Sequence, residues 1–175
     1  MNRKLLRLAI FPIIIGAMHL NANSQGLKKN DLITYAETMF DSGNESSPAK
    51  HGSVNIRVIR NFKKEFTAIE NETWSKMRNG CYIVRFSKNN IFHRVEYNQK
   101  GHWLSTTKFY APEYLSQSVR QAVLGTYHDY KIFCVAEVNV DSRTAFYVTL
   151  EDETSWLKVR LMGDKMEEVE AYKKG

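Results

Sequence analysis

A stripe of apolar residues that occurs twice in this chain restricts its possible folds more than any other feature. Val58, Phe62 and Phe66 lie four residues apart and would share one face of a helix. The same spacing returns 61 residues later, at Val119, Val123 and Tyr127, behind Ser116 as an expected N-cap. A pattern repeated at this distance is typical of a structural duplication.

Four strand-like segments follow each expected helix. They cover residues 72–77, 81–87, 91–97 and 102–109, and then 131–140, 144–150, 156–162 and 166–172. The turn "RNG" (78–80) suits a hairpin with Gly80 in the left-handed conformation, and "NQKG" (98–101) suits a turn closed by Gly101. Such short connections make neighbouring strands antiparallel. We therefore expect an α+β fold made of two tandem repeats, 55–110 and 111–175. Each repeat is a helix plus antiparallel strands, and both helices pack on one face of a curved antiparallel sheet.

The strands also indicate which face of the sheet the helices cover. In "CYIVRF" (81–86), Tyr82, Val84 and Phe86 point to one face and Ile83 and Arg85 to the other. The segment "AFYVTL" repeats this motif 64 residues later, and its equivalents of the first three residues are all apolar. The face with Tyr82 is therefore expected to lie under the helices. The opposite face, called the outer face below, collects Ile83, Arg85, Phe92, Arg94, Tyr147, Trp156, Lys158 and Arg160.

Residues 1–24 have the three parts of a secretory signal peptide. The chain starts with the basic residues Arg3, Lys4 and Arg7. The apolar run "LAIFPIIIGAMHL" is short for a membrane span, and "ANS" (22–24) has the small residues of a cleavage site. We expect a periplasmic or secreted protein with no stable membrane anchor after cleavage.

Removal of these residues also changes the charge. It takes away three basic residues and no acidic ones, which lowers the formal net charge from +6 to +3. The remaining lysines and arginines alternate with acids instead of forming a patch, so nucleic acid is not an expected partner.

Residues 25–54 are expected to form an N-terminal extension. The segment "KNDLITYAETMF" (29–40) has apolar residues at helical spacing, with Asn30 as an N-cap. The segment "DSGNESSPAKHGS" (41–53) has the composition of turns and linkers.

The chain has two cysteines, Cys81 and Cys134. An even number of cysteines in an exported chain allows a disulfide between them. The alternative is that both are small buried residues of strands.

Several segments together resemble a known family. The helix "VIRNFKKEF" (58–66), "GCYIVRF" (80–86), "VEYNQKGHWLSTT" (95–107) and, after a second helix, "YVTL" (147–150) are similar to the PepSY-like, beta-lactamase-inhibitor-like family of exported bacterial proteins. The resemblance covers about residues 55–173. It implies helices packed on an antiparallel sheet, an envelope location and a non-enzymatic character, and it carries over no catalytic residues. The family often has a proline after the leucine that precedes the second helix, where this chain has Leu115 followed by Ser116.

The sequence has no arrangement typical of catalysis or of metal or cofactor binding. His93, His102 and His128 lack partners at metal-ligand spacing and are expected on the surface or on edge strands. The acidic segments "EDE" (151–153) and "MEEVE" (166–170) lack the spacing of a calcium loop. We therefore expect no enzymatic activity, no metal and no cofactor.

The outer face is the part of the sheet to which the sequence assigns a function. We expect it to be exposed, with aromatic rings beside arginines, a composition typical of protein-binding surfaces. The candidate binding residues are Arg85, Phe92, Arg94, Trp156 and Arg160. The competing interpretation is a cross-strand ladder in which basic side chains cover aromatic rings for stability alone.

Two hypotheses for function follow. The favoured one is a non-catalytic binding protein whose outer face contacts an envelope or extracellular protein or peptide. A narrower form of this hypothesis is that the protein inhibits its partner. The alternative is a carrier that holds a small apolar or anionic ligand between the helices and the sheet.

Overall fold

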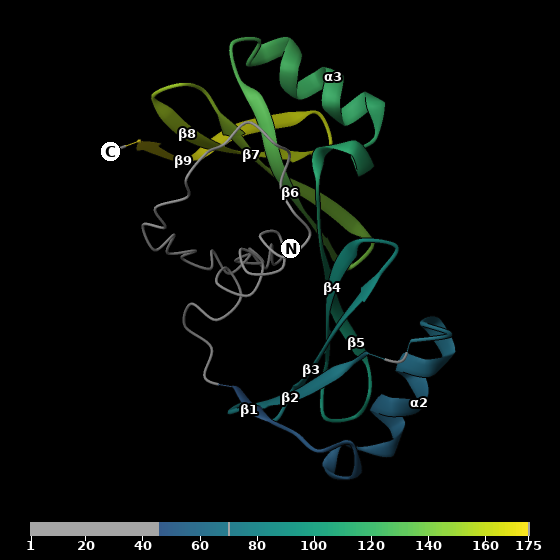
Figure 1. The fold of residues 1–175 in the computed structure, drawn as a ribbon. Coiled ribbons are helices and arrows are strands. Elements are labelled where there is room, and N and C mark those ends of the chain that lie inside the picture. The colour runs from purple at the N-terminus through teal and green to yellow at the C-terminus, as the bar shows by residue number, and fades with distance from the viewer. Residues whose placement is uncertain (1–45, 70, 175) are drawn as a thin grey trace, which may run out of the picture.

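The strands pair in the order of the chain and form one antiparallel sheet (Figure 1). The structure, a computed structural model, describes residues 46–69 and 71–174. Within these ranges the strands are β1 (Ser46–Pro48), β2 (Thr73–Met77), β3 (Tyr82–Lys88), β4 (Ile91–Tyr97), β5 (Trp103–Tyr110), β6 (Lys131–Val140), β7 (Arg143–Glu151), β8 (Ser155–Met162) and β9 (Lys165–Lys173). Figure 1 shows the sheet extending from β1 at the bottom to β8 and β9 at the top, with one helix beside each end.

Each helix begins at a residue whose side chain caps it. The elements are α2 (Ile56–Glu65) and α3 (Gln117–Thr126), preceded by the short 3-10 turns η1 (His51–Ser53) and η2 (Pro112–Tyr114). Asn55 Oδ1 accepts a hydrogen bond from the Arg57 N–H at 2.9 Å. Ser116, the expected N-cap of α3, accepts one at Oγ from the Val119 N–H at 3.5 Å. These caps satisfy backbone donors that have no partner within the first helical turn.

The two helices pack on the same face of the sheet, over two separate cores. The first core contains Val54, Val58, Ile59, Phe62, Trp74, Tyr82, Val84, Phe86, Val95 and Tyr97. The second contains Tyr110, Leu115, Val123, Val135, Val148, Leu150, Leu157 and Val159. The strand register connects the two sets across one face, because Val84, Val95, Thr106 and Asn139 lie opposite one another in turn. The outer face is therefore the face opposite α2 and α3.

The α+β fold class is confirmed. The strands expected at 91–97 and 131–140 have the same bounds as β4 and β6, and the ends of the other expected strands differ by at most one residue. Gly80 has the expected left-handed backbone, with a φ of +82°. The expected signal peptide and the helix expected at 29–40 lie outside the described residues.

The end of the expected linker differs from the prediction. Residues 46–48 form β1, which pairs with β2 and becomes the edge strand of the sheet, and Val54 is buried in the first core. The composition of this segment is typical of turns, but the edge of β2 offers backbone donors and acceptors that a neighbouring chain segment can satisfy.

Gly101 sets how closely α2 approaches the turn between β4 and β5. Its φ is +88°, and a Cβ at this position would lie 3.1 Å from the backbone carbonyl carbon of Arg57. Asn55 and Asn61 donate side-chain hydrogen bonds to the carbonyl oxygens of Gln99 (3.0 Å) and Gly101 (2.8 Å). The side chains of Asn55 and Asn61 therefore hold α2 against this turn.

We expect Gly101→Ala to lower the free energy of unfolding by about 1–2 kcal/mol, because alanine disfavours left-handed backbone and its Cβ would press against α2. Gly163→Ala is the matched control, since Gly163 also has a positive φ, of +59°, but nothing lies within 4 Å of a Cβ there. Urea denaturation of both variants measures the difference. A loss in Gly163→Ala as large as that in Gly101→Ala would contradict a role for the contact with α2.

Candidate functional site

The structure places all five candidate binding residues on the outer face, in two groups. Arg85 and Arg94 lie opposite each other on β3 and β4, and Phe92 lies two residues before Arg94. Trp156 and Arg160 lie on β8. Three strands separate β4 from β8, so the groups are about 19 Å apart at a strand spacing of about 4.8 Å. The sheet does not bring the five residues together at one point.

The group on β3 and β4 is largely closed to solvent, which corrects one expectation. Phe92 and Arg94 are each 7% exposed, so this part of the outer face is not the exposed surface that the sequence predicts. The Arg94 guanidinium pairs with the carboxylate of Glu96, and Arg85 Nη1 donates a hydrogen bond to Ser75 Oγ at 3.0 Å. Alternation along a strand predicts the direction of a side chain but not its burial, and the binding role of these residues stays a prediction.

On β8, Trp156 is held by an aromatic ring and by a cation. The ring of Phe133 meets it edge-on, with centroids 4.7 Å apart and planes at 77°. Lys174 Nζ lies 4.6 Å from the centre of the Trp156 ring. Both contacts favour this position of the indole. Trp156 is therefore a partly exposed and preorganised aromatic side chain.

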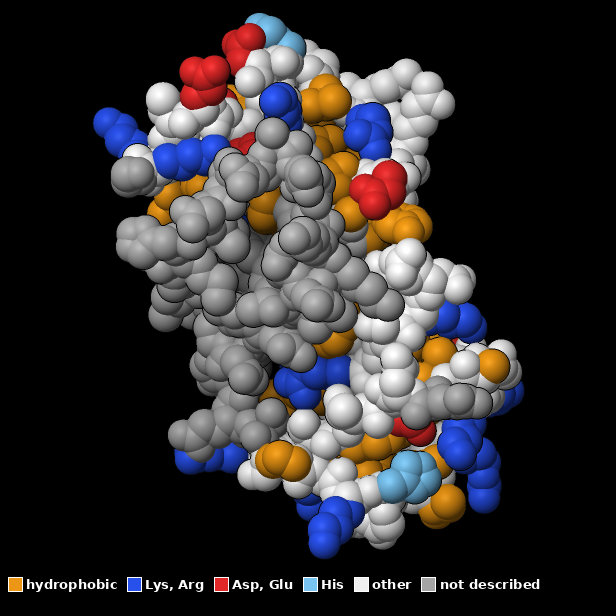
Figure 2. Space-filling view, in the orientation of Figure 1, with side chains coloured by type: hydrophobic (Ala, Val, Ile, Leu, Met, Phe, Trp, Pro, Cys, Tyr) orange, Lys and Arg blue, Asp and Glu red, His pale blue; other side chains and the backbone are white. Residues whose placement is uncertain are grey.

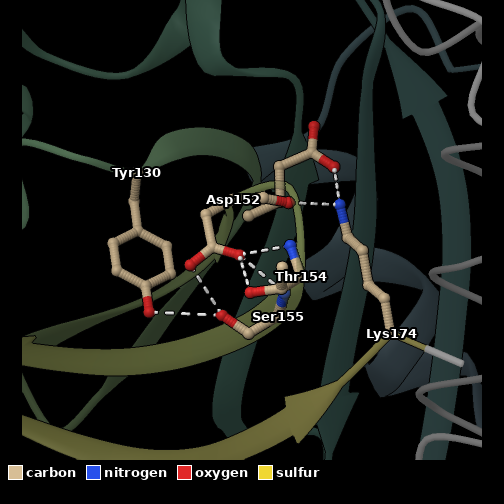
Figure 3. Close-up of polar contacts among 6 residues, drawn as sticks. Tyr130, Asp152, Thr154, Ser155 and Lys174 are labelled. Atoms are coloured by element: carbon tan, nitrogen blue, oxygen red, sulfur yellow. Dashed lines mark hydrogen bonds and ion pairs between the residues drawn. The ribbon is translucent and has the colours of Figure 1, made fainter.

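The turn between β7 and β8 fixes the end of the strand that carries Trp156 (Figure 3). Asp152 Oδ1 accepts hydrogen bonds from the N–H groups of Thr154 (2.7 Å) and Ser155 (2.6 Å), and Oδ2 accepts one from the Ser155 hydroxyl at 2.8 Å. The hydrogen bond from Thr154, followed by those from Ser155, lowers the pKa of Asp152 to about 2. Tyr130 lies beside this turn, with its hydroxyl 3.3 Å from Ser155 Oγ. The turn therefore keeps a charged carboxylate over the whole ordinary pH range.

Lys174 connects this turn to Trp156. Its ammonium group donates hydrogen bonds to Glu151 Oε2 at 3.2 Å and to the carbonyl oxygen of Asp152 at 2.5 Å (Figure 3). The same ammonium group lies over the indole ring. Lys174 therefore connects the β7–β8 turn to the indole ring of Trp156.

Ion pairs continue along β8 and β9. Lys158 is buried, and its Nζ lies 2.7 Å from Glu170 Oε2. The guanidinium of Arg160 pairs with the carboxylate of Glu167. Figure 2 shows that lysine and arginine side chains are spread over both ends of the molecule with acidic side chains among them. The charge of the visible described surface is therefore mixed and does not form one basic patch.

The disulfide that the sequence allows is not formed. Cys81 precedes β3, at the end of the sheet near Trp103, whereas Cys134 lies in β6 beyond the level of Tyr110. The two strands are three positions apart, which is about 14 Å. Disulfide-bonded residues have Cα atoms closer than about 7 Å. Cys134 is instead a small buried residue, which was the alternative for both cysteines.

His93 is buried, which corrects its expected surface position. It is 8% exposed, and its ring stacks on Phe86 with centroids 4.7 Å apart. Burial lowers the pKa of His93, so the ring is neutral at neutral pH. The prediction failed because β4 is an interior strand and His93 points to the face that the helices cover. His102 and His128 are exposed, as expected.

Between the two cores lies a polar network that the sequence analysis missed. Glu137 in β6 accepts hydrogen bonds from Lys108 Nζ (2.8 Å), the Tyr110 hydroxyl (2.9 Å) and Asn139 Nδ2 (3.0 Å). Thr144 extends the network by donating to Asn139 Oδ1 at 2.8 Å. Lys108 and Glu137 are cross-strand partners in β5 and β6. Their pairing depends on the register across a long connection, so no local sequence signal reveals it.

The network fixes the protonation of its members. Burial alone would raise the pKa of Glu137, but the hydrogen bonds from Lys108, Asn139 and Tyr110 outweigh it, and the resulting pKa is lower than the ordinary value. Burial, followed by the neighbouring charge of Glu137, raises the pKa of Tyr110. At neutral pH the Glu137 carboxylate is therefore charged and the Tyr110 phenol is neutral, so the phenol donates its hydrogen bond to a charged acceptor.

This geometry defines a class of α+β protein in which helices cover one face of an antiparallel sheet and aromatic and basic residues occupy the other. No family model and no curated protein matches the chain. Solved structures do match it. A DUF2874 family protein from Bacteroides ovatus is similar with a TM-score of 0.54 and 17% identity, over 64% of this chain and 85% of that chain.

Two further structures have the same TM-score of 0.54. One is a BLIP-like protein from Bacteroides fragilis, at 15% identity over 68% of this chain and 85% of that chain. The other is a protein from Bacteroides eggerthii that is described with a proposed periplasmic location, at 14% identity over 69% of this chain and 88% of that chain. At these identities the likeness shows the fold, which supports the beta-lactamase-inhibitor-like part of the resemblance. None of the described helices is long and apolar enough to cross a membrane.

Proposed function

We propose that the protein is a non-catalytic binding protein whose outer sheet face contacts a protein or peptide. The observation that carries the proposal is the position of Trp156, which Phe133 and Lys174 hold on a strand that also presents Arg160. Tryptophan and arginine are over-represented among the residues that dominate binding energies. A side chain that is already ordered also loses less entropy on binding.

Trp156 is the proposed anchor, and Arg160 is the proposed orienting charge. Arg85, which is partly exposed, extends the proposed surface across the sheet toward β3, and Phe92 and Arg94, each 7% exposed, contribute to it only through the edges that solvent reaches. Inhibition of an enzyme is the narrower form of this proposal.

We further propose that the protein works in the periplasm or outside the cell. The signal peptide expected at residues 1–24 supports this location. The proposed periplasmic location of the Bacteroides eggerthii protein agrees with it, and the BLIP-like description of the Bacteroides fragilis protein agrees with a binding function.

We also propose that the two halves of the molecule arose by tandem duplication. This is the PepSY-like part of the family resemblance. The order of a helix followed by four strands occurs twice, as α2 with β2–β5 and as α3 with β6–β9. Each half also has its own core. The constant spacing of 64 residues between the two strand motifs supports the same origin.

Photocrosslinking in intact cells tests the proposed surface. A photoreactive residue at Tyr147, which lies opposite Arg160 on the outer face, is expected to form a discrete protein adduct. Trp156→Ala in the same chain should reduce the adduct at least about tenfold, because truncating an interface anchor typically costs about 2 kcal/mol or more. The adduct is measured by immunoblotting and identified by mass spectrometry.

Two controls define the outcome. The photoreactive residue at Arg60, exposed on α2, should not form the adduct, and Tyr114→Ala, which truncates an exposed aromatic ring in η2, should leave it unchanged. Circular dichroism shows whether each variant is folded. An adduct of equal strength from position 60, or one that Trp156→Ala does not weaken in a folded chain, would exclude the outer face as the binding surface.

A further inference from the structure

Four apolar side chains of the outer face are buried, although α2 and α3 lie on the other side of the sheet. Ile83 on β3 is 1% exposed, Phe92 on β4 7%, Phe109 on β5 5% and Cys134 on β6 3%. Ile83 alternates with first-core residues of β3, and Phe92 is the cross-strand partner of Phe109. Cys134 lies opposite Thr149, which alternates with second-core residues of β7. These four residues, called the outer-face set below, extend across β3–β6.

A sheet alone does not bury side chains in this way. Side chains stand roughly perpendicular to a sheet, so neighbours on the same face shield their flanks and leave their ends open to solvent. Within residues 46–69 and 71–174 the strands form one sheet, and both α-helices pack on its other face. We therefore look for the layer over the outer-face set in another part of the chain.

The N-terminal extension joins the sheet within reach of this set. It ends at Ser46, the first residue of β1, and β1 is three strands from β4, or about 14 Å at a strand spacing of about 4.8 Å. Residues 41–45 can span about 17 Å at about 3.4 Å per residue, so they can reach β4. A helix of residues 29–40 would be about 18 Å long, whereas β3–β6 are about 14 Å wide. The extension is therefore long enough to cross the outer-face set.

The extension also has the apolar residues that such a layer requires. As a helix, residues 29–40 would present one apolar face, made of Leu32, Ile33, Ala36, Met39 and Phe40. An amphipathic helix of this length is stable in water only when its apolar face packs against another surface. The helix therefore needs an apolar partner, and the outer-face set needs a cover.

The charges of the two surfaces also match. Arg85 and Arg94 lie opposite each other on the outer face, a position in which like charges destabilise a sheet. Residues 25–45 contain two lysines and four acidic residues, which gives this segment a formal side-chain charge of −2. An acidic segment over the two arginines reduces their repulsion. The extension is therefore suited to this face by its charge as well as by its apolar residues.

We propose that residues 25–45 fold back over the outer face and that the helix of residues 29–40 covers the outer-face set with its apolar side. This cover leaves Trp156 and Arg160 on β8, which are both partly exposed, open to a partner. A partner that also reaches β4 has to displace the extension, so the extension limits access to this part of the surface. That consequence rests on the proposed binding function, whereas the cover itself does not.

The thiol of Cys134 tests the cover without a partner. The experiment uses the mature chain, residues 25–175, with Cys81→Ser, so that Cys134 has the only thiol. Under the cover, Cys134 is expected to react slowly with N-ethylmaleimide, as measured by mass spectrometry. Ile33→Asp together with Phe40→Asp should raise the reaction rate about tenfold or more, because both substitutions replace a buried apolar side chain with a charge.

A matched pair of substitutions is the control. Thr34→Asp together with Thr38→Asp adds the same charge on the opposite side of the helix and should leave the reaction rate of Cys134 unchanged. Circular dichroism shows whether each variant is folded. If the variant with Ile33→Asp and Phe40→Asp does not fold, a photoreactive residue in place of Phe40 still decides. It is expected to crosslink within the chain to peptides of β3–β6, which mass spectrometry identifies.

Three results would overturn the proposal. They are a Cys134 thiol that reacts as fast with the unsubstituted extension as in the variant with Ile33→Asp and Phe40→Asp, equal rates in the two pairs of aspartate substitutions, and the absence of crosslinks from position 40 to β3–β6. None of these measurements involves a partner. Failure of the cover is therefore distinct from a failure of the outer face to bind a protein or peptide.

Discussion

Phe62→Ala is expected to lower the free energy of unfolding by about 3–5 kcal/mol, a large share of the stability of an ordinary domain. Phe62 is 1% exposed and is one of the three buried residues of α2. Its ring centroid lies 5.3 Å from that of Trp74 and 5.4 Å from those of Phe66 and Phe86. Truncation loses these aromatic contacts and leaves a cavity that the surrounding rings can close only by moving. Chemical denaturation measures the loss.

The same helix supplies the control for this substitution. Ile56 is 64% exposed in the first turn of α2, so Ile56→Ala should change the free energy of unfolding by less than about 0.5 kcal/mol. The two substitutions remove side chains of the same apolar kind from one element. Similar losses in both variants would contradict the inference that the apolar stripe of α2 holds the first half together.

The periodicity that predicts this stripe also explains why so much of the fold follows from the sequence. Side chains four residues apart share a helix face, and alternate residues share a strand face, so periodicity assigned Phe62 and Val84 to the apolar faces of their elements. Both lie in the first core. Gly80 and Gly101 marked two turns because their backbones require positive φ values. These signals are local, and the structure agrees with them closely.

The features that the sequence did not reveal are those that depend on distant neighbours. Periodicity placed Phe92 and Arg94 on the outer face but could not give their burial. It likewise could not show that His93 lies on an interior strand against Phe86. The two groups of candidate binding residues are far apart because three strands, β5, β6 and β7, lie between β4 and β8 in the sheet.

The second large effect is expected for Glu137→Gln, which should lower the free energy of unfolding by about 2–3 kcal/mol at neutral pH. An amide oxygen cannot accept all the hydrogen bonds that Lys108, Tyr110 and Asn139 now donate to the carboxylate. Each lost bond costs about 1 kcal/mol, and the Lys108 contribution is reduced because its side chain is 34% exposed. Glu167→Gln is the control, since the Glu167 side chain is 55% exposed and should lose less than about 0.5 kcal/mol.

The lowered pKa of Glu137 fixes how this loss depends on pH. The carboxyl group takes up a proton near pH 4.3, roughly its ordinary value, in the unfolded chain and only at lower pH in the folded protein. Its contribution is therefore complete above about pH 4.3 and disappears as the pH falls through the folded value. The titration of Asp152 occurs in both proteins and cancels in the difference between them. That of His93 does not cancel, because the Glu137 charge raises the pKa of His93 and Glu137→Gln removes this effect, so the comparison is made below about pH 4.3, where the Glu137 carboxyl group itself takes up a proton. The gap in stability between the wild-type protein and Glu137→Gln should thus shrink in acid.

Lys108→Met separates the charge from the hydrogen bonds. In the Glu137→Gln background this substitution should recover about 1 kcal/mol, because it removes an ammonium group that has lost its counter-charge. In the wild-type background it should destabilise, because it leaves the Glu137 carboxylate without its cation. The opposite signs of these two effects measure the coupling between Lys108 and Glu137. Chemical denaturation of the wild-type protein, the two single variants and the double variant gives this coupling free energy directly. Two outcomes would contradict a stabilising role for the charge of Glu137. One is a loss of stability in Glu137→Gln that stays unchanged in acid, and the other is an effect of Lys108→Met that has the same sign in both backgrounds.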